Sequence, residues 1–158
     1  MTKQRSRDRV RISNENAQVL ENLGDSTAPT RAFDSQAEAV VFAATIGHCF
    51  SKFEPIEGQT SKAILFQQID NATDLGTYLD AVFALAHTGD ISILMPIEGS
   101  GNSDNDRVLI FESYINGGLS YLRKLGFDPT QPIDTVIDTV LNLVRTIDPK
   151  SSDLLSRS

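Results

Sequence analysis

Apolar residues recur at helical spacing over most of this chain, which predicts a structure built almost entirely of helices. The pattern is clearest in segments 72–87, 108–125 and 133–147, where apolar residues three or four positions apart form one face. Glycine or proline lies near a boundary of each segment, as is typical of helix ends. We therefore predict an all-α protein with a single compact helical domain.

Two further helices are predicted near the N-terminus, each with a start signal. Ser13 can cap a helix that ends at Gly24, because glycine is a common residue at the end of a helix. Ser35 and Glu38 have the spacing of a capping box, in which each side chain accepts a hydrogen bond from an unpaired backbone N–H group. Residues 37–50 are apolar nearly all round, which is typical of a central, buried helix.

Two segments depart from the helical pattern, and a third is predicted to be a loop. Residues 9–13 alternate between polar and apolar side chains, which predicts a short N-terminal strand-like arm. Residues 63–69, with the sequence AILFQQI, suit either a short strand or a helical turn, and both interpretations stay open. Residues 98–106 contain two glycines and two asparagines and are predicted to form a mobile surface loop.

The net charge of −7 is unevenly distributed along the chain. Residues 1–11 hold five basic residues and one aspartate, a net charge of +4, so the remaining residues carry −11. A basic end on an acidic body is typical of a polyanion contact confined to that end. The alternative is a disordered basic terminus that only aids solubility. We accordingly divide the chain into a flexible basic arm (1–8), a helical domain (9–147) and a disordered tail (148–158).

Composition excludes several classes of protein. For a chain of 158 residues with 40% hydrophobic and 22% charged residues, one soluble domain is expected. The longest apolar runs fall well short of the roughly 20 residues of a membrane span, and the basic N-terminus leads into polar residues rather than a signal-peptide core. The single cysteine, Cys49, excludes an internal disulfide framework and a cysteine-based zinc cluster. These features predict a cytoplasmic protein that makes no membrane contact.

The residues that commonly catalyse reactions are few and poorly placed. His48 and His87 lie near the ends of apolar helices, where packing or capping explains a histidine better than catalysis does. His48 and Cys49 are neighbours in a predicted helix, so their side chains point about 100° apart and cannot act as a couple. The glycine-rich segment 99–101 is not followed by the lysine of a phosphate-binding loop. We predict no enzymatic activity, no cofactor and no catalytic or metal-binding residue.

Gly117 and Gly118 lie inside a predicted helix, where each costs roughly 1 kcal/mol relative to alanine. Such a cost is commonly offset by a close backbone approach that a side chain would block. We therefore predict that this pair lies at a tight helix crossing or at a contact between subunits.

The order of elements in residues 9–50 (strand, helix, loop and helix) is that of ribbon-helix-helix DNA-binding proteins. In these proteins two chains pair their strands into an antiparallel ribbon that enters the major groove. Alternation places Arg9, Arg11 and Ser13 on the exposed face of the strand and the apolar residues between them inward. The alternative is a strand-like arm that closes the helical core of one chain.

Four stretches of the sequence resemble a known family. They are Arg9–Ser13, the alanine-rich helix 37–47, which ends in Ile-Gly-His, Ala84–Asp90, and Phe111–Leu119, which contains Asn-Gly-Gly. Together they are similar to the small accessory family associated with Dnd DNA-phosphorothioation systems, and more remotely to the helical E component of that machinery. The similarity runs from about residue 9 to residue 125, which leaves 133–147 outside it.

The resemblance implies an accessory, non-enzymatic role in bacterial DNA sulfur modification or in the linked restriction defence against phage. It implies three kinds of partner: DNA, the modification or restriction subunits of a Dnd-type system, and further copies of the chain in a homo-oligomer. DNA contact in the E component is attributed to a basic surface. The body of this chain is acidic, so we expect DNA contact only at the basic end. The predicted DNA-binding residues are Lys3, Arg5, Arg7, Arg9, Arg11 and Ser13.

Two alternative functions stay open. The first is an acidic protein–protein adaptor that docks on a basic partner or imitates the charge of DNA. The second is a ribbon-helix-helix transcriptional repressor, which requires a dimer and a palindromic DNA site.

Overall fold

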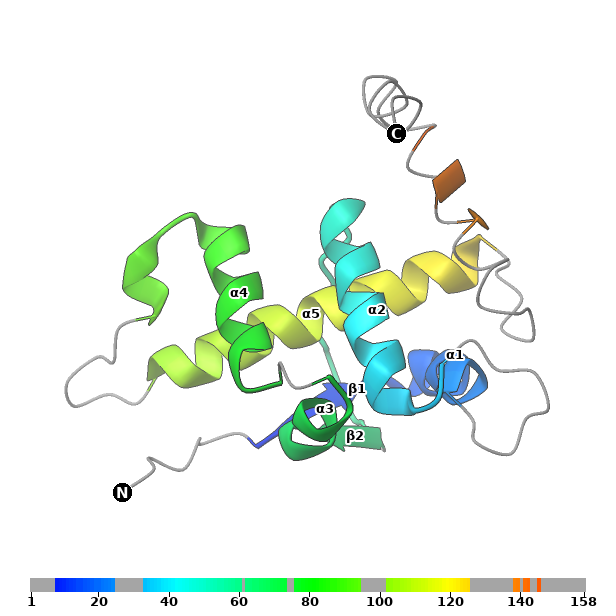
Figure 1. The fold of residues 1–158 in the computed structure, drawn as a ribbon, viewed down its shortest axis with the longest axis horizontal. Helices are drawn as coiled ribbons and strands as arrows, with labels where there is room; N and C mark the ends of the chain where they lie inside the picture. Colours follow the sequence, from blue (N-terminus) through cyan, green and yellow to red (C-terminus); the bar gives the residue numbers. More distant parts are fainter. Residues whose placement is uncertain are drawn as a thin grey trace.

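The computed structural model describes most of the chain between Asp8 and Leu125. Among the described residues it has five α-helices, one 3-10 helix and a two-stranded antiparallel sheet, which confirms the predicted all-α class with a short N-terminal strand (Figure 1). Residues 1–7 of the predicted arm, the predicted tail 148–158 and most of the predicted helix 133–147 lie outside the described residues. The described residues are 8–24, 33–60, 62–73, 76–94, 102–125, 138, 139, 141, 142 and 145.

The longest helix, α5 (Asn102–Lys124), is crossed by α2 (Gln36–Cys49) and α4 (Gly76–Thr88), as Figure 1 shows. The prediction of a mobile loop over 98–106 is wrong for 102–106, which form the start of α5. The polar and acidic residues there also suit the first turn of a helix, because their side chains can accept hydrogen bonds from its free N–H groups and are attracted to the positive end of its dipole.

None of the described helices has the length and hydropathy needed to cross a membrane. The buried hydrophobic residues of α5 are Val108, Phe111, Tyr114, Ile115, Leu119 and Leu122.

The first two helices begin where the cap signals predict. The carbonyl of Ser13 accepts the first backbone N–H groups of α1 (Asn14–Gly24). Ser35 caps α2, because its Oγ accepts the N–H of Glu38 at 3.2 Å. The second half of the predicted capping box differs, since the Glu38 carboxylate accepts the N–H of Asp34 at 3.0 Å instead of that of the cap residue. The side chain of Glu38 thus reaches one residue further back and ties the preceding loop to the helix.

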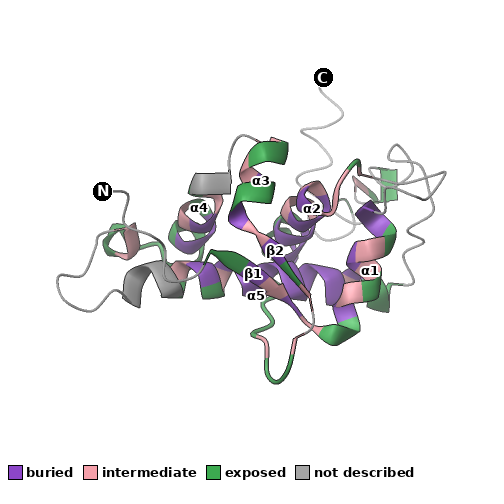
Figure 2. Ribbon diagram, turned by 90° about the horizontal axis from the view of Figure 1, so that it is seen from below, coloured by how far each residue is buried: buried purple, intermediate pink, exposed green. Residues whose placement is uncertain are grey.

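The N-terminal strand β1 (Arg9–Ile12) pairs in antiparallel fashion with β2 (Lys62–Leu65) of the same chain. Val10 and Ile12 are fully buried, as the alternation of polar and apolar residues predicts. Figure 2 shows β1 beside α5, and β1 contacts that helix while β2 contacts β1 and α3. The strand is therefore part of the hydrophobic core, and a truncation that reaches it would disturb that core.

The segment 63–69 contains both the end of β2 and the start of α3 (Phe66–Thr73), so each of its two interpretations is correct for part of it. The prediction of one continuous helix over 72–87 is wrong, because α3 ends before α4 begins at Gly76. Glycine has a low helix propensity but is tolerated at a helix terminus, so Gly76 is suited to the first position of α4. The apolar connector after α4 is a single 3-10 turn, η1 (Ile91–Leu94).

Candidate functional site

The residues predicted to contact DNA fall into two groups. Arg9, Arg11 and Ser13 lie in β1 or directly after it, whereas the others are outside the described residues. Arg9 is exposed, and its Nε lies 3.2 Å from Oδ1 of Asp8, which is exposed as well. Exposed pairs of this kind contribute about 0–1 kcal/mol, so Arg9 can exchange Asp8 for another anion at little cost. The residues outside the described part are Lys3, Arg5 and Arg7.

Arg11 lies in a different environment from Arg9. Its guanidinium forms a two-pronged contact with Glu112 of α5, with Nη2 2.8 Å from Oε1 and Nε 3.2 Å from Oε2. The carboxylate is buried, with 2% of its side chain exposed, while the Arg11 side chain is 34% exposed. The hydrogen bond to Glu112 raises the pKa of Arg11 above its usual value. Arg11 therefore fastens β1 to α5 and is not a free cation.

Two side chains of α5 also bind the backbone of β1. Glu112 Oε2 accepts the N–H of Arg11 at 2.7 Å. Asn116 accepts the N–H of Ser13 at 2.9 Å through Oδ1 and donates to the carbonyl of Arg11 at 3.1 Å through Nδ2. These groups occupy the edge of β1 opposite to β2, in the way that a neighbouring strand would.

This arrangement has a direct consequence for the ribbon-helix-helix interpretation. A two-chain ribbon requires the edge of β1 to be free for the strand of a partner. Here β2 pairs with one edge, and Glu112 and Asn116 occupy the other at Arg11 and Ser13. The order of elements is that of the motif, but the strand closes the core of its own chain.

Glu112 and Asn116 belong to a buried polar row on α5 that continues one turn further at Ser120. Asn16 of α1, which is fully buried, donates to Ser120 Oγ at 3.1 Å, and Ser120 donates back to Asn16 Oδ1 at 3.2 Å. Sequence analysis missed this row as a site, although its members lie four residues apart within a stretch of α5, residues 108–122, that is otherwise largely apolar. That spacing is the signal that could have revealed it, because three polar residues on a core face require partners from another element.

The glycine pair of α5 lies against two different segments of the chain. A Cβ atom added to Gly118 would overlap the carbonyl oxygen of Ala43, and Gly47 faces Gly118 in the same crossing of α2 and α5. A Cβ atom added to Gly117 would overlap the carbonyl oxygen of Lys52. Because Gly118 has no side chain, α2 and α5 can approach each other closely. The same absence at Gly117 leaves room for the backbone that follows α2.

The two histidines, far apart in the sequence, both lie beside Tyr114 of α5. His87 Nδ1 is 2.7 Å from the Tyr114 hydroxyl, and the ring centroids of His48 and Tyr114 are 5.4 Å apart. Burial raises the pKa of Tyr114, so its hydroxyl stays protonated beside Nδ1 of His87. Phe53 stacks on His87 with ring centroids 4.5 Å apart. The described residues contain no group of three or more His, Cys, Asp or Glu that could hold a metal ion.

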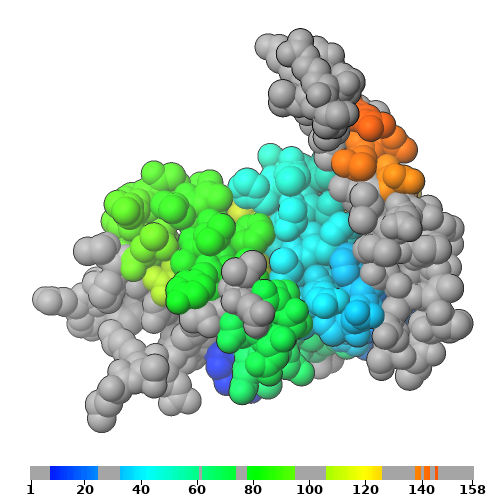
Figure 3. All heavy atoms as spheres, viewed as in Figure 1, coloured from blue at the N-terminus to red at the C-terminus, as the bar shows by residue number. Residues whose placement is uncertain are grey.

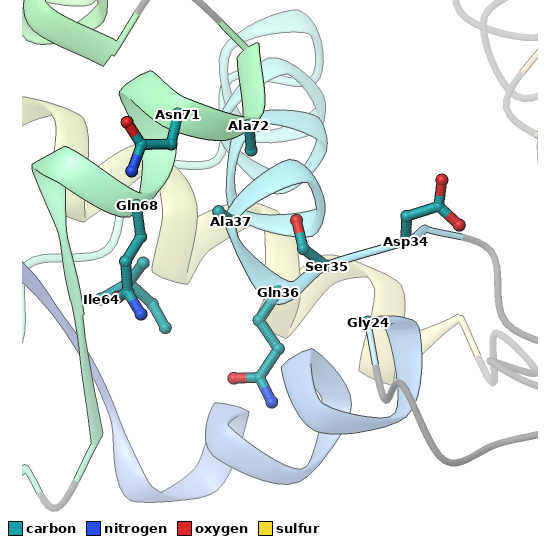
Figure 4. Close-up of a pocket in the computed structure, with 9 residues that line it drawn as sticks. All are labelled: Gly24, Asp34, Ser35, Gln36, Ala37, Ile64, Gln68, Asn71 and Ala72. Carbon is teal, nitrogen blue, oxygen red and sulfur yellow. The ribbon is translucent and has the colours of Figure 1, made fainter.

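A cavity of about 620 Å³ lies between the end of α1, the start of α2, β2 and α3 (Figure 4). Figure 4 shows the amide side chains of Gln36 and Gln68 extending into the space between α2 and β2. Asn71 adds a third amide, and Asp34 is the one carboxylate among the lining residues. Among the described residues predicted to bind DNA, Arg9, Arg11 and Ser13 do not line this cavity. Its groups can bind a polar ligand, but they do not include the paired acid and base of a catalytic site.

The fold and these contacts define a small helical protein whose N-terminal strand is locked onto a central helix by buried polar side chains. The chain matches the family model of DNA sulphur modification system-associated protein 4 over residues 9–155 and belongs to that family. No match was found among curated proteins or among solved structures. The resemblance drawn from the sequence is confirmed, and the family match extends it, because it includes 133–147. The match begins at Arg9, the first residue of β1.

Proposed function

We propose that this accessory protein of DNA sulphur modification systems is not an enzyme and works by binding: it assembles with a second copy of itself and contacts DNA at its basic end. The family supports the accessory role. The observation that carries the proposal is on α4, a surface helix that directs three large apolar side chains to solvent while its aspartate is buried.

The outward row of α4 consists of Tyr78, Val82 and Leu85, which are 67%, 58% and 38% exposed. The charged residue of this helix, Asp80, is 1% exposed and forms an ion pair with Arg107 of α5, with Oδ2 and Nε 3.5 Å apart. Surface helices ordinarily direct charges outward and apolar residues inward. A contiguous exposed apolar row is typical of a protein–protein interface. Figure 3 shows α4 on the surface of the molecule.

A second copy of the chain is the partner that this row suits. The three side chains are spaced over two helical turns and carry no charge, so the same row of another copy can pack against them about a two-fold axis. Ile91 of η1, three residues after the end of α4, is a further exposed apolar residue, with 71% of its surface accessible. A subunit of the modification or restriction machinery is the alternative occupant of the row.

Light scattering on the full chain tests the assembly. We expect the wild-type protein to have the mass of a dimer, and Val82→Glu to have the mass of a monomer with an unchanged circular dichroism spectrum. Leu125→Glu is the matched control, because Leu125 is 46% exposed but lies just after the C-terminal end of α5. A monomeric wild-type protein, or equal effects of the two substitutions, would overturn assembly through α4.

We propose that Lys3, Arg5, Arg7 and Arg9 contact DNA. Arg11, in contrast, holds β1 in place. Two observations support this proposal: the net charge of +4 at the basic end and the exposure of Arg9. Each phosphate that is neutralised adds about 0.9 to the slope of log affinity against log salt concentration. A test by truncation must stop before Asp8, since the carbonyl of Asp8 accepts the N–H of Phe66 at 2.9 Å and Val10 is buried in the core.

The acidic body favours a second candidate function, a protein adaptor that docks on a basic partner. The residues after the basic end carry a net charge of −11, which repels DNA and attracts a cationic surface. This candidate predicts no DNA affinity at about 150 mM salt, where long-range attraction is screened beyond about 8 Å. Co-purification with a larger modification or restriction subunit, without DNA retention, would favour it.

A further inference from the structure

Lys52 and Lys124 differ from the other basic residues in the described part of 8–125. Neither has a carboxylate oxygen within 4.0 Å of its ammonium group among the described residues, whereas every other lysine and arginine there forms an ion pair. Acidic residues outnumber basic ones in this body, so a cation without a carboxylate partner is unusual in it. The paired residues are Arg9, Arg11, Lys62, Arg107 and Arg123.

The two unpaired lysines line the same hollow, of about 210 Å³, beside the C-terminal end of α5. Lys52 Nζ lies 5.1 Å from the centroid of the Tyr121 ring, a cation–π contact that holds the ammonium group over the ring face. Ser51 also lines the hollow, and Glu54 is the one carboxylate-bearing residue among those that line it. Two ammonium groups against one carboxylate leave the hollow with an excess of positive charge.

The backbone that carries Lys52 is fixed on both sides. The N–H of Lys52 donates to the carbonyl of Gly47 at 2.7 Å, and the N–H of Glu54 donates to the carbonyl of Ser113 at 3.0 Å. Ser51 has a φ angle of +54°, a conformation that non-glycine residues rarely adopt. Gly117 admits the Lys52 carbonyl at a position that any side chain would fill. Lys52 is thus held at the hollow by contacts with both α2 and α5.

We propose that this hollow, which we call the Lys52–Lys124 hollow, binds a phosphate-type oxyanion, either inorganic phosphate or a phosphodiester group of a nucleic acid. Lysine binds phosphate as a compact point charge, and the Ser51 hydroxyl adds a hydrogen-bond donor. The hollow is large enough for a tetrahedral oxyanion. It belongs to the body of the protein, so it is independent of DNA contact through the basic end.

If Lys124 has only a structural role, its substitution should affect stability and not phosphate binding. Lys124 is the last residue of α5, where the negative end of the helix dipole favours a cation even without a ligand. In that case Lys124→Gln would lower the thermal stability slightly and would leave phosphate binding unchanged. The binding experiment therefore has to measure affinity and stability separately.

Titration of the full chain with inorganic phosphate, followed by amide NMR, tests the site. We expect saturable shifts at Lys52, Gly117 and Lys124, and a loss of affinity of about tenfold in Lys52→Gln and in Lys124→Gln. Lys62→Gln is the matched control, since Lys62 forms an ion pair with Glu21 at 2.9 Å and does not line the hollow. It should bind phosphate as the wild type does.

A second titration separates the two sources of phosphate. It uses a short DNA duplex and a full-length chain in which Lys3, Arg5 and Arg7 are replaced by glutamine. Shifts at Lys52 and Lys124 that inorganic phosphate reverses identify a phosphodiester ligand, and shifts with inorganic phosphate alone identify the free anion. The proposal is overturned if neither probe gives saturable shifts at these residues, or if the shifts persist at full affinity in both lysine variants.

Discussion

The Glu112 carboxylate accepts three hydrogen bonds from Arg11, one from the backbone N–H at 2.7 Å and two from the guanidinium at 2.8 and 3.2 Å. The buried side chain of Glu112 thereby holds the backbone of Arg11 in place and balances its positive charge, although Arg11 lies more than a hundred positions earlier in the chain. This relationship explains why a basic strand at the end of an acidic protein is part of its core. It also separates Arg11, which is committed to Glu112, from Arg9, which is exposed.

Glu112→Gln should therefore destabilise the protein by about 2 kcal/mol, because it leaves Arg11 without its counter-charge in a partly buried site. The cost is below that of a fully buried pair, since the Arg11 side chain is 34% exposed and solvent screens its charge. Chemical denaturation measures the effect. Glu15→Gln is the control, as Glu15 is 74% exposed in its pair with Arg123, and it should change stability by less than about 0.5 kcal/mol. Equal effects of the two substitutions would contradict the anchoring role of Glu112.

Gly118→Ala should destabilise the protein, although alanine in an ordinary helix is about 1 kcal/mol more favourable than glycine. The added Cβ would meet the backbone carbonyl of Ala43, so α2 and α5 must move apart, at a cost of about 1–3 kcal/mol. Thermal unfolding measures the sign directly. A higher melting temperature in this variant would show that the two helices do not cross as closely as described.

Stability at alkaline pH should depend on Tyr114. Burial raises the pKa of Tyr114 above the usual 10.0, so the unfolded state loses the phenol proton before the folded state does. Its contribution to stability is complete below pH 10 and is lost as the pH rises through the folded-state pKa. The free energy of unfolding should thus fall more steeply above pH 10 in the wild type than in Tyr114→Phe. Tyr78→Phe, at a residue that is 67% exposed, should leave the alkaline decline unchanged.

Much of the helical framework could be predicted from the sequence, because apolar spacing and cap residues are local signals. Ser13 and Ser35 begin the helices that their spacing predicts, and Val10 is buried as alternation requires. The pairing of β1 with β2 could not be predicted. The segment 63–69 is too short for its period to separate strand from helix, and its partner strand lies some fifty residues away.

Sequence analysis did not identify the buried polar row of α5 for a related reason. Glu112 and Asn116 look like the solvated face of a helix until their partners are known, and those partners come from the other end of the chain. Sequence analysis did not identify the outward apolar row of α4 either. Leu79, Phe83 and Val82 all fit the apolar repeat of one helix, and only the packing of α4 on α5 shows that Val82 faces solvent.

The most direct test of the proposed function is the affinity of the full chain for a fluorescent DNA duplex, measured by anisotropy at several salt concentrations. Replacement of Lys3, Arg5 and Arg7 by glutamine should reduce the salt slope by about 0.9 for each lost phosphate contact. Lys62→Gln should leave the slope unchanged, because Lys62 is paired with Glu21. An unchanged slope in the triple variant, or no DNA binding by the wild type at low salt, would contradict DNA contact through the basic end.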